Sequence, residues 1–351
     1  MTTRALPAPQ PPVGVIESLA TGFETVTGRL ALILLPLALD VLLWLGPHLS
    51  VRPVVQDVLE QVAKLAVLQP SIAPAESLWR TVLTPVAHRF NLLSLLSVPA
   101  LPRLGCLPGA WCLPSLMAVR SPVAVPGGVP HIVPIGNWLE MLTLIVALYL
   151  VGLFLGALYL GAIALQVRDA QLDWRAVVHH VGGWWARLVA LAAVVSLAAL
   201  AYMTPVTLAA VVAGQVLGQA GFVFVYLLGA SAGLWVLFYL AFVVHALLLQ
   251  GRGLFGAMRD SARVVQWNLP STLVLFALIA GLSFGMGVVW SIPAEDSWLA
   301  LVGIAGHAYV VTGLAAASFV YYKDRFRWSS ELRDYLVARA EGLKGARTKT
   351  K

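Results

Sequence analysis

The stretch WLEMLTLIVALYLVGLFLGALYLGAIAL, residues 138–165, contains a single charged residue, Glu140, within an otherwise apolar run. A helix needs about 20 mostly apolar residues to cross a bilayer. Hydrocarbon offers no hydrogen-bond partner to a free backbone group, so the crossing segment must satisfy its own backbone. The stretch meets that requirement and predicts a membrane-spanning helix.

The composition of the whole chain agrees with that prediction. Of its 351 residues, 60% are hydrophobic and 11% are charged, whereas soluble domains are about 45–50% apolar and about 25% charged. This composition excludes a soluble enzyme, a disordered chain and a nucleic-acid-binding domain. We expect an all-α, polytopic membrane helix bundle whose net charge of +7 concerns topology and anionic lipid.

Five further stretches bring the expected number of transmembrane helices to six, accompanied by interfacial amphipathic helices and one long outer loop. The five stretches cover about residues 30–50, 187–204, 222–249, 269–292 and 298–322. Residues 205–220 are apolar but are interrupted by Pro205, Gly214 and Gly218. We interpret them as an extension of the third helix followed by a turn.

Basic residues predict the orientation, because Lys and Arg collect in the cytoplasmic loops of membrane proteins. Three Arg lie in each of the segments 166–187 and 250–268, and nine Lys or Arg follow Tyr322. The predicted order is a cytoplasmic segment 1–29 with an interfacial helix, a first span 30–50, an outer loop 51–137, a five-helix region 138–322 and a basic tail 323–351. Both termini are expected in the cytoplasm, with the tail held to anionic lipid as a short amphipathic helix.

The outer loop 51–137 is expected to carry two amphipathic helices, of which the second is interrupted at Pro85. Their apolar positions are Val54, Val58, Val62 and Leu65 in the first, and Leu78, Val82, Val86, Phe90 and Leu93 in the second. Such an apolar loop suits folding over the helix ends or binding a protein partner. Cys106 and Cys112, the only cysteines, lie in this loop, either as a disulfide or as two buried free thiols.

An internal repeat is expected in the five-helix region. DWRAVVHHVGGWWARLVAL (173–191) and LFGAMRDSARVVQWNLPSTL (254–273) align at an offset of 81 residues. The alignment pairs Trp174 with Phe255 and Leu188 with Leu269. Each segment is amphipathic and lies between two spans, and parallel repeats of this kind occur in transporters.

Three arginines of the inner segments, Arg175, Arg259 and Arg263, are expected at the cytoplasmic interface beside anionic headgroups. In the second segment one face is predicted to be apolar, with Arg259 and Arg263 on the opposite face. The apolar face consists of Phe255, Met258, Ala262 and Val265.

The inner-loop sequence GLFGAMRDSARVVQWNLPSTL (253–273) resembles the membrane domain attached to some glycerophosphoryl diester phosphodiesterases. The segment GFETVTGRLALILLPLALDVLLWLGPHLS (22–50) is similar to the start of a loose group of uncharacterised bacterial membrane proteins. About half of the chain takes part, and the first inner loop departs from the pattern at His179 and His180. No phosphodiesterase catalytic domain is recognised. The resemblance therefore implies an accessory membrane module, located in the bacterial inner (plasma) membrane.

Ionisable residues inside spans are costly and are candidates for functional sites. Asp40 and His307 lie at similar depth from the outer ends of the first and sixth spans, so they could form a buried polar pair that relays protons. Alternatively, Asp40 satisfies a backbone or hydroxyl donor, and His307 bonds to a neighbouring helix. We expect no catalytic residue, cofactor, metal site or nucleic-acid partner, because no sequence motif for such chemistry is present.

Two functions are compatible with the sequence. The first is a non-enzymatic scaffold or accessory subunit of a membrane complex or envelope process, with a protein partner at the outer loop. The alternative is a small transporter or permease built on the parallel repeat.

Overall fold

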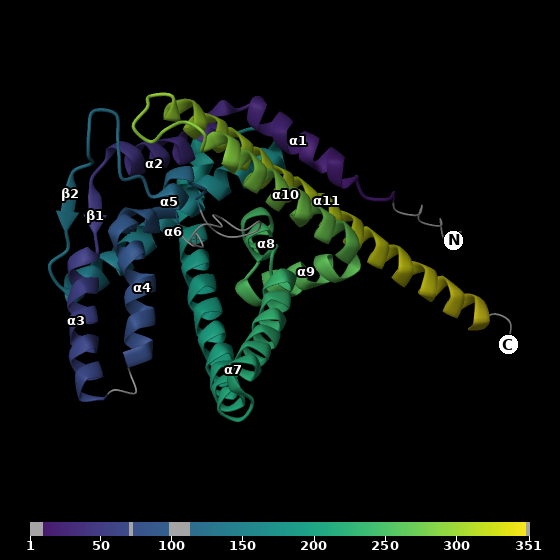
Figure 1. Ribbon diagram of the computed structural model, residues 1–351. Helices are drawn as coiled ribbons and strands as arrows, with labels where there is room; N and C mark the ends of the chain where they lie inside the picture. The colour runs from purple at the N-terminus through teal and green to yellow at the C-terminus, as the bar shows by residue number, and fades with distance from the viewer. Residues whose placement is uncertain (1–9, 70–72, 98–112, 349–351) are drawn as a thin grey trace.

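The computed structural model describes residues 10–69, 73–97 and 113–348, which are mostly helical (Figure 1). The described strands, β1 (His48–Ser50) and β2 (Ile132–Pro134), form one parallel pair. The helices are α1 (Val15–Thr27), η1 (Leu30–Ile33), α2 (Leu34–Leu45), α3 (Arg52–Leu68), α4 (Ala73–Arg89), η3 (Leu92–Ser97), α5 (Leu116–Arg120), α6 (Trp138–Asp169), α7 (Trp174–Tyr239), α8 (Val243–Gln250), α9 (Leu254–Trp267), α10 (Leu269–Trp290) and α11 (Ala300–Thr348). The predicted all-α fold class is confirmed.

Four helical segments of the described chain are long and apolar enough to cross a membrane: Trp138–Asp169, Trp174–Gln250, Leu269–Trp290 and Ala300–Arg339. A fifth candidate is the pair Val15–Thr27 and Leu30–Leu45, which is bent by 92°. Lengths and hydropathies of this kind suit a multi-pass membrane protein.

The bent pair formed by α1 and the segment Leu30–Leu45 comes first in the chain. It is bent because α1 packs along α11 in the antiparallel direction. The Val13 backbone N–H donates to Asp324 Oδ2 at 2.8 Å. Further along α1, Gly22 approaches Ala317 so closely that a Cβ at position 22 would overlap the backbone of α11. A glycine permits this close helix contact. The helix expected ahead of the first span is present as α1, and it is joined to the expected span through a bend of 92°; the second helix of the pair ends at Leu45.

The helix α7 reverses direction at Gly218, whose φ of 72° lies in the left-handed region that glycine adopts without strain. Two helical arms result, and the Tyr202 hydroxyl on the first donates to the Gly229 carbonyl on the second at 2.9 Å. The hairpin projects from the rest of the molecule (Figure 1). Residues 205–220 thus continue the preceding helix and then turn, in agreement with the interpretation of that segment.

Two units of the membrane region, the first unit (138–192) and the second unit (219–272), have similar helix ends. The helix α6 is followed by Ala170 with φ 55°, and α8 is followed by Gly251 with φ 63°, at an offset of 81 residues. The next helices begin at Trp174 and Leu254, at an offset of 80. The connection is one residue shorter in the second unit.

The burial pattern after this connection matches at an offset of 80. Five pairs are buried in both units: Val177 and Ala257, Val181 and Ser261, Trp184 and Val264, Leu188 and Asn268, Ala192 and Thr272. The alignment at an offset of 81 contains no gap and so does not account for the shorter connection. It therefore shifts the predicted apolar face of α9 by about one residue from the face that is buried. Phe255, expected on that face, is 80% exposed, whereas Val264 is buried.

The described parts of the segment 51–137 fold against α2 and the first turns of α6. A separate apolar cluster joins it to α6 through Met141, Leu144, Ile145 and Leu148; its buried members are Val51, Val54, Ala87, Leu92 and Ile135. The helix α4 continues through Pro85, where an interruption was predicted; the fixed φ of proline lies within helix geometry, but the missing N–H removes one hydrogen bond from the helix. Burial lowers the pKa of His48 at the start of β1, which keeps the imidazole neutral at neutral pH.

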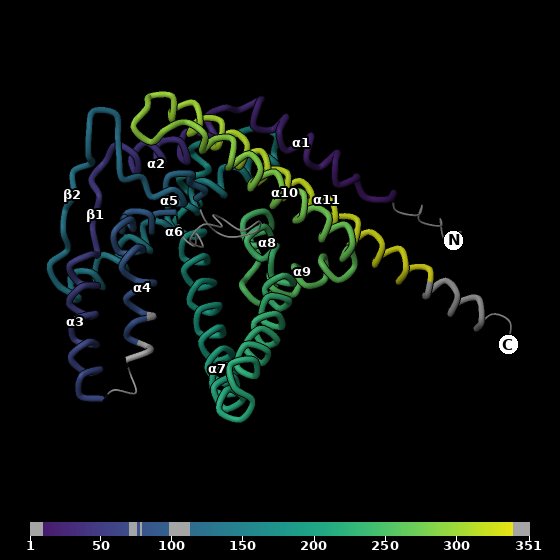
Figure 2. Tube along the Cα trace, viewed as in Figure 1, coloured from purple at the N-terminus to yellow at the C-terminus, as the bar shows by residue number. Residues whose placement is uncertain are grey.

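The helix α11 runs without a break from Ala300 to Thr348, and its later turns, drawn in yellow, project away from the body of the protein (Figure 2). At 1.5 Å per residue, residues 323–348 extend it by about 39 Å. The tail was expected to be a short amphipathic helix held to anionic lipid. In the structure it is helical and continues the last candidate span.

Candidate functional site

The outer polar cluster is centred on Asp40 of α2, whose side chain is fully buried. Its carboxylate accepts hydrogen bonds from Ser115 Oγ at 2.5 Å, Leu116 N at 3.1 Å and Met117 N at 2.8 Å. Ser115 also caps α5 by accepting from Ala118 N at 3.0 Å. Three donors and the positive end of a short helix offset the cost of burying this carboxylate.

The helix α11 brings His307 to the same carboxylate. Its Nδ1 lies 3.7 Å from Asp40 Oδ2 and is a buried atom without a hydrogen-bond partner. The two residues predicted as a pair are therefore neighbours in space. Asp40 also accepts a serine donor, as in the alternative interpretation, but this donor comes from the outer segment.

The arrangement of Asp40, Ser115 and His307 differs from that of a catalytic triad. A nucleophilic serine gives its proton to a histidine that the carboxylate orients. Here the Ser115 hydroxyl donates directly to Asp40 and accepts from a backbone N–H, so it is committed to capping α5. The cluster fastens α5 to α2, and its geometry is that of a structural tether.

Further contacts at this end hold the turn between α10 and α11. The Trp44 indole N–H donates to the Glu295 carbonyl at 2.7 Å, and the Val123 backbone N–H donates to the Glu295 carboxylate at 3.1 Å. Arg120, at the end of α5, donates to the Pro293 carbonyl at 3.1 Å. Segments far apart in the chain thus meet at one end of the bundle.

A second set of buried polar groups joins the second unit to α11. His245 Nε2 lies 2.8 Å from Ser318 Oγ, and the His245 ring packs 4.2 Å from the Phe319 ring, centroid to centroid. The Tyr321 hydroxyl lies 2.8 Å from Ser271 Oγ and 3.0 Å from Thr272 Oγ1. These hydroxyl groups were not predictable from the sequence, because Ser, Thr and Tyr occur throughout the apolar helices without a distinguishing spacing.

The remaining predicted residues are distributed as follows. Arg175 and Arg259 are exposed, and Arg263 Nη1 lies 3.4 Å from Asp260 Oδ1. The predicted disulfide or thiol pair, Cys106 and Cys112, lies outside the described residues. Within the described ranges no group of three or more His, Cys, Asp or Glu side chains could hold a metal ion.

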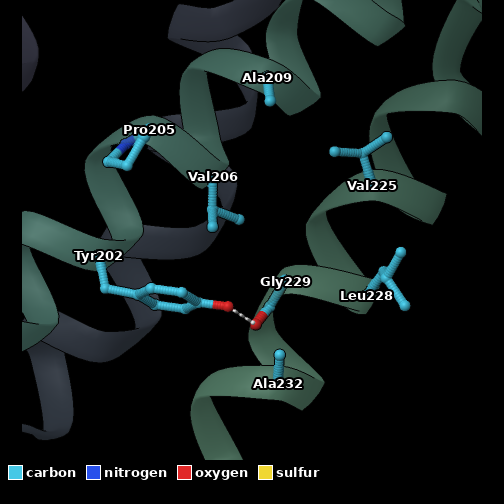
Figure 3. Close-up of a pocket in the computed structure, with 8 residues that line it drawn as sticks. All are labelled: Tyr202, Pro205, Val206, Ala209, Val225, Leu228, Gly229 and Ala232. Atoms are coloured by element: carbon cyan, nitrogen blue, oxygen red, sulfur yellow. Dashed lines mark hydrogen bonds between the residues drawn. The ribbon is translucent and has the colours of Figure 1, made fainter.

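The hairpin of α7 forms an apolar groove of about 430 Å³ between its arms (Figure 3). Its lining consists of Tyr202, Pro205, Val206, Ala209, Val225, Leu228, Gly229 and Ala232. The only polar side-chain group in that set, the Tyr202 hydroxyl, is bonded to the Gly229 carbonyl. The groove therefore offers an apolar surface with little to recognise a polar solute.

No family model, no curated protein and no solved structure matches this chain. The resemblance to the phosphodiesterase-associated membrane domain stays a prediction, and the protein's role must be inferred from the geometry of its own residues.

Proposed function

We propose that this chain is a non-enzymatic integral membrane protein that acts as a scaffold or accessory subunit of a membrane complex. The observation that carries the proposal is the set of hydrogen bonds that the buried Asp40 carboxylate accepts. The buried carboxylate is occupied by three donors from the α5 region, so the costliest group in the first span fixes the outer segment to the membrane helices. Positioning that segment is the role that this geometry supports best.

The proposed topology has six spans with both termini in the cytoplasm. The bent pair of α1 and α2 counts as the first span, and the two arms of α7 count as the third and fourth. Contacts among the basic segments support this order: Lys323 Nζ donates to the Val167 and Arg168 carbonyls at 2.8 and 3.2 Å. The end of α6 and the start of the tail therefore lie at the same level of the bundle.

The hairpin formed by α3 and α4 is the proposed partner surface. It projects beside the body of the protein (Figure 1) and exposes apolar side chains on both helices, among them Val67, Leu68, Trp79 and Val82. Exposed apolar side chains grouped in this way are typical of interaction sites. In the proposed topology this hairpin lies outside the cytoplasm.

The test is capture of a partner from native membranes by crosslinking and affinity purification. We expect a stable partner with the wild-type chain and its loss in the double variant Val67→Ser, Leu68→Ser. The matched control Val337→Ser removes an exposed valine from the tail and should capture the same partner. A transporter, the alternative favoured by the repeat, would instead show solute flux in proteoliposomes without a partner, and that result would contradict the proposal.

The role of Asp40 is tested separately. Asp40→Ala leaves the donors at the start of α5 buried without an acceptor, at a cost of about 1–3 kcal/mol for each unsatisfied group. We expect faster proteolysis of the outer segment and loss of the partner, with the membrane helices still folded. Unchanged proteolysis would show that Asp40 does not fasten the segment.

A further inference from the structure

The helix α9 has one face against the protein and one face exposed. Ala257, Ser261 and Val264 are fully buried. Phe255 and Arg259, one helical turn apart, are exposed on the opposite side. An aromatic ring at 80% exposure is unfavourable in water and favourable at a membrane interface, where the ring can enter the acyl region.

The charges of this helix are paired except at Arg259. Asp260 Oδ2 lies 3.5 Å from Arg252 Nε, and Asp260 Oδ1 lies 3.4 Å from Arg263 Nη1. Among the described residues no hydrogen bond or ion pair engages the Arg259 side chain. This guanidinium is therefore available to an anionic group outside the protein, beside the exposed ring of Phe255.

The position of α9 in the chain fixes it at the end of the apolar helices. Gly251 and Gly253 connect it to the candidate span that ends at Gln250, and Asn268 connects it to α10. Because both neighbours are apolar enough to span, their ends hold α9 at the boundary between hydrocarbon and water. The exposed face of the helix then meets lipid headgroups.

The first unit shares one part of this surface chemistry. At the offset of 80 that matches the burial pattern, Phe255 and Arg259 correspond to Arg175 and His179, and both of these are exposed. The Arg175 backbone N–H is bonded to Asp173, but no bond to its guanidinium is found within the described part of the chain. An exposed basic or titratable side chain thus occupies one equivalent position in both units, as Arg259 and His179, whereas Arg175 stands where the second unit has the ring of Phe255.

We infer that the exposed face of α9 binds anionic lipid headgroups, with Arg259 on the headgroup phosphate and Phe255 among the acyl chains. A free phosphate shares the headgroup's charge but has no acyl chain, so it would use Arg259 alone. The inference rests on the orientation given under the proposed function, which places α9 at the cytoplasmic face. It does not depend on a partner at the α3–α4 hairpin.

The test uses the full chain in nonionic detergent with equal amounts of phosphatidylglycerol and phosphatidylcholine, and native mass spectrometry measures the ratio of the two bound lipids. We expect the wild type to prefer phosphatidylglycerol. Arg259→Gln should lower the ratio about fivefold, since a basic residue near an anionic surface contributes about 1 kcal/mol. Phe255→Ser should reduce retention of both lipids.

Arg259→Lys should keep the preference, and Arg80→Gln is the matched control because Arg80 lies on α4 of the outer hairpin and is paired with Glu76 at 2.8 Å. An unchanged ratio in Arg259→Gln would overturn the inference. Displacement of phosphatidylglycerol by inorganic phosphate would overturn it in favour of a free-phosphate site. Arg259→Gln should still capture the partner of the outer hairpin, so failure of the lipid site and failure of the scaffold role are distinguishable.

Discussion

Equivalent buried positions of the two units carry different chemistry. Val181 and Ala192 of the first unit are apolar, whereas the corresponding Ser261 and Thr272 of the second unit carry hydroxyl groups. The same holds before the connection, where Ala164 of α6 corresponds to His245 of α8 at the offset of 81. The two units therefore share a backbone pattern, but apolar contacts stabilise these positions in the first unit and polar groups occupy them in the second.

In the second unit, a polar side chain bonds to backbone groups at a break in the helix, and the first unit has no such break. The helical path of the second unit is interrupted between Tyr239 and Val243, whereas α6 is continuous. Ser261 Oγ accepts from Phe242 N at 3.0 Å and donates to the Tyr239 carbonyl at 2.8 Å. Buried backbone groups released by a break need such partners, so the break and the serine belong together.

Large and small side chains are also exchanged between the units. In the first unit Gly161 faces Trp184, and a Cβ at position 161 would overlap the indole ring. The corresponding residues of the second unit are Phe242 and Val264, both fully buried. The bulky residue lies on the later helix in the first unit and on the earlier helix in the second. The two units thus share helix positions but place the bulky side chain on different helices.

The largest effect is expected for His245→Ala, which gives the second unit the residue of the first. Removing a ring packed against Phe319 and Phe242 leaves a cavity, and such changes cost about 3–5 kcal/mol. The measurement is the thermal unfolding midpoint in detergent.

His245→Phe keeps the ring and removes only the bond to Ser318, so it should cost far less than the alanine variant. Equal losses in both variants would mean that the polar group, and not the packing, distinguishes the two units at this position.

The helical part of the fold was predictable because apolar runs such as 138–165 are unambiguous in length. The bend between α1 and α2 was not, because it depends on the contact of Gly22 with Ala317, nearly the whole chain apart in sequence. The predicted alignment of the repeat was wrong by one residue after the connection. A single sequence does not show that the connection before Leu254 is one residue shorter.

The candidate site, like the fold, was predictable only in part. Asp40 and His307 were identified because charged or titratable groups inside apolar helices are conspicuous. Ser115 was not identified as the partner of Asp40, since it lies in a Pro- and Gly-rich stretch whose path cannot be derived from periodicity. The true partners of a buried carboxylate depend on tertiary folding.

The next effect in size is expected for Ser261→Ala. Both the Phe242 N–H and the Tyr239 carbonyl lose their bond to the hydroxyl, and each buried unsatisfied group costs about 1–3 kcal/mol. We expect a total of about 3 kcal/mol and faster hydrogen exchange at residues 239–243. Ser330→Ala, at a half-buried serine bonded within its own helix, is the control. Normal exchange at the break would contradict the link between the serine and the interruption.

A smaller loss is expected for Gly161→Ala in the first unit, because the new methyl group overlaps the Trp184 ring. Overpacking of this kind costs about 1–3 kcal/mol, and we expect about 2 kcal/mol. Gly182→Ala makes the same change on the same unit with nothing within 4 Å, and it should be neutral or stabilising because alanine favours helix. Equal thermal midpoints for the two variants would show that the glycine–tryptophan contact does not hold the first unit together.

The smallest effect is expected for Thr272→Val, which gives the second unit an apolar residue where the first unit has Ala192. The Tyr321 hydroxyl loses Thr272 but keeps Ser271 at 2.8 Å, so the tyrosine is not left unsatisfied. Since one neutral hydrogen bond contributes about 0.5–1.5 kcal/mol, we expect a loss below about 1 kcal/mol in the detergent unfolding assay. The double variant Ser271→Ala, Thr272→Val strands the Tyr321 hydroxyl and should lose more than the sum of its parts. Strict additivity would mean that the two hydroxyls contact α11 independently, and that polarity at this position is incidental to how the second unit is anchored.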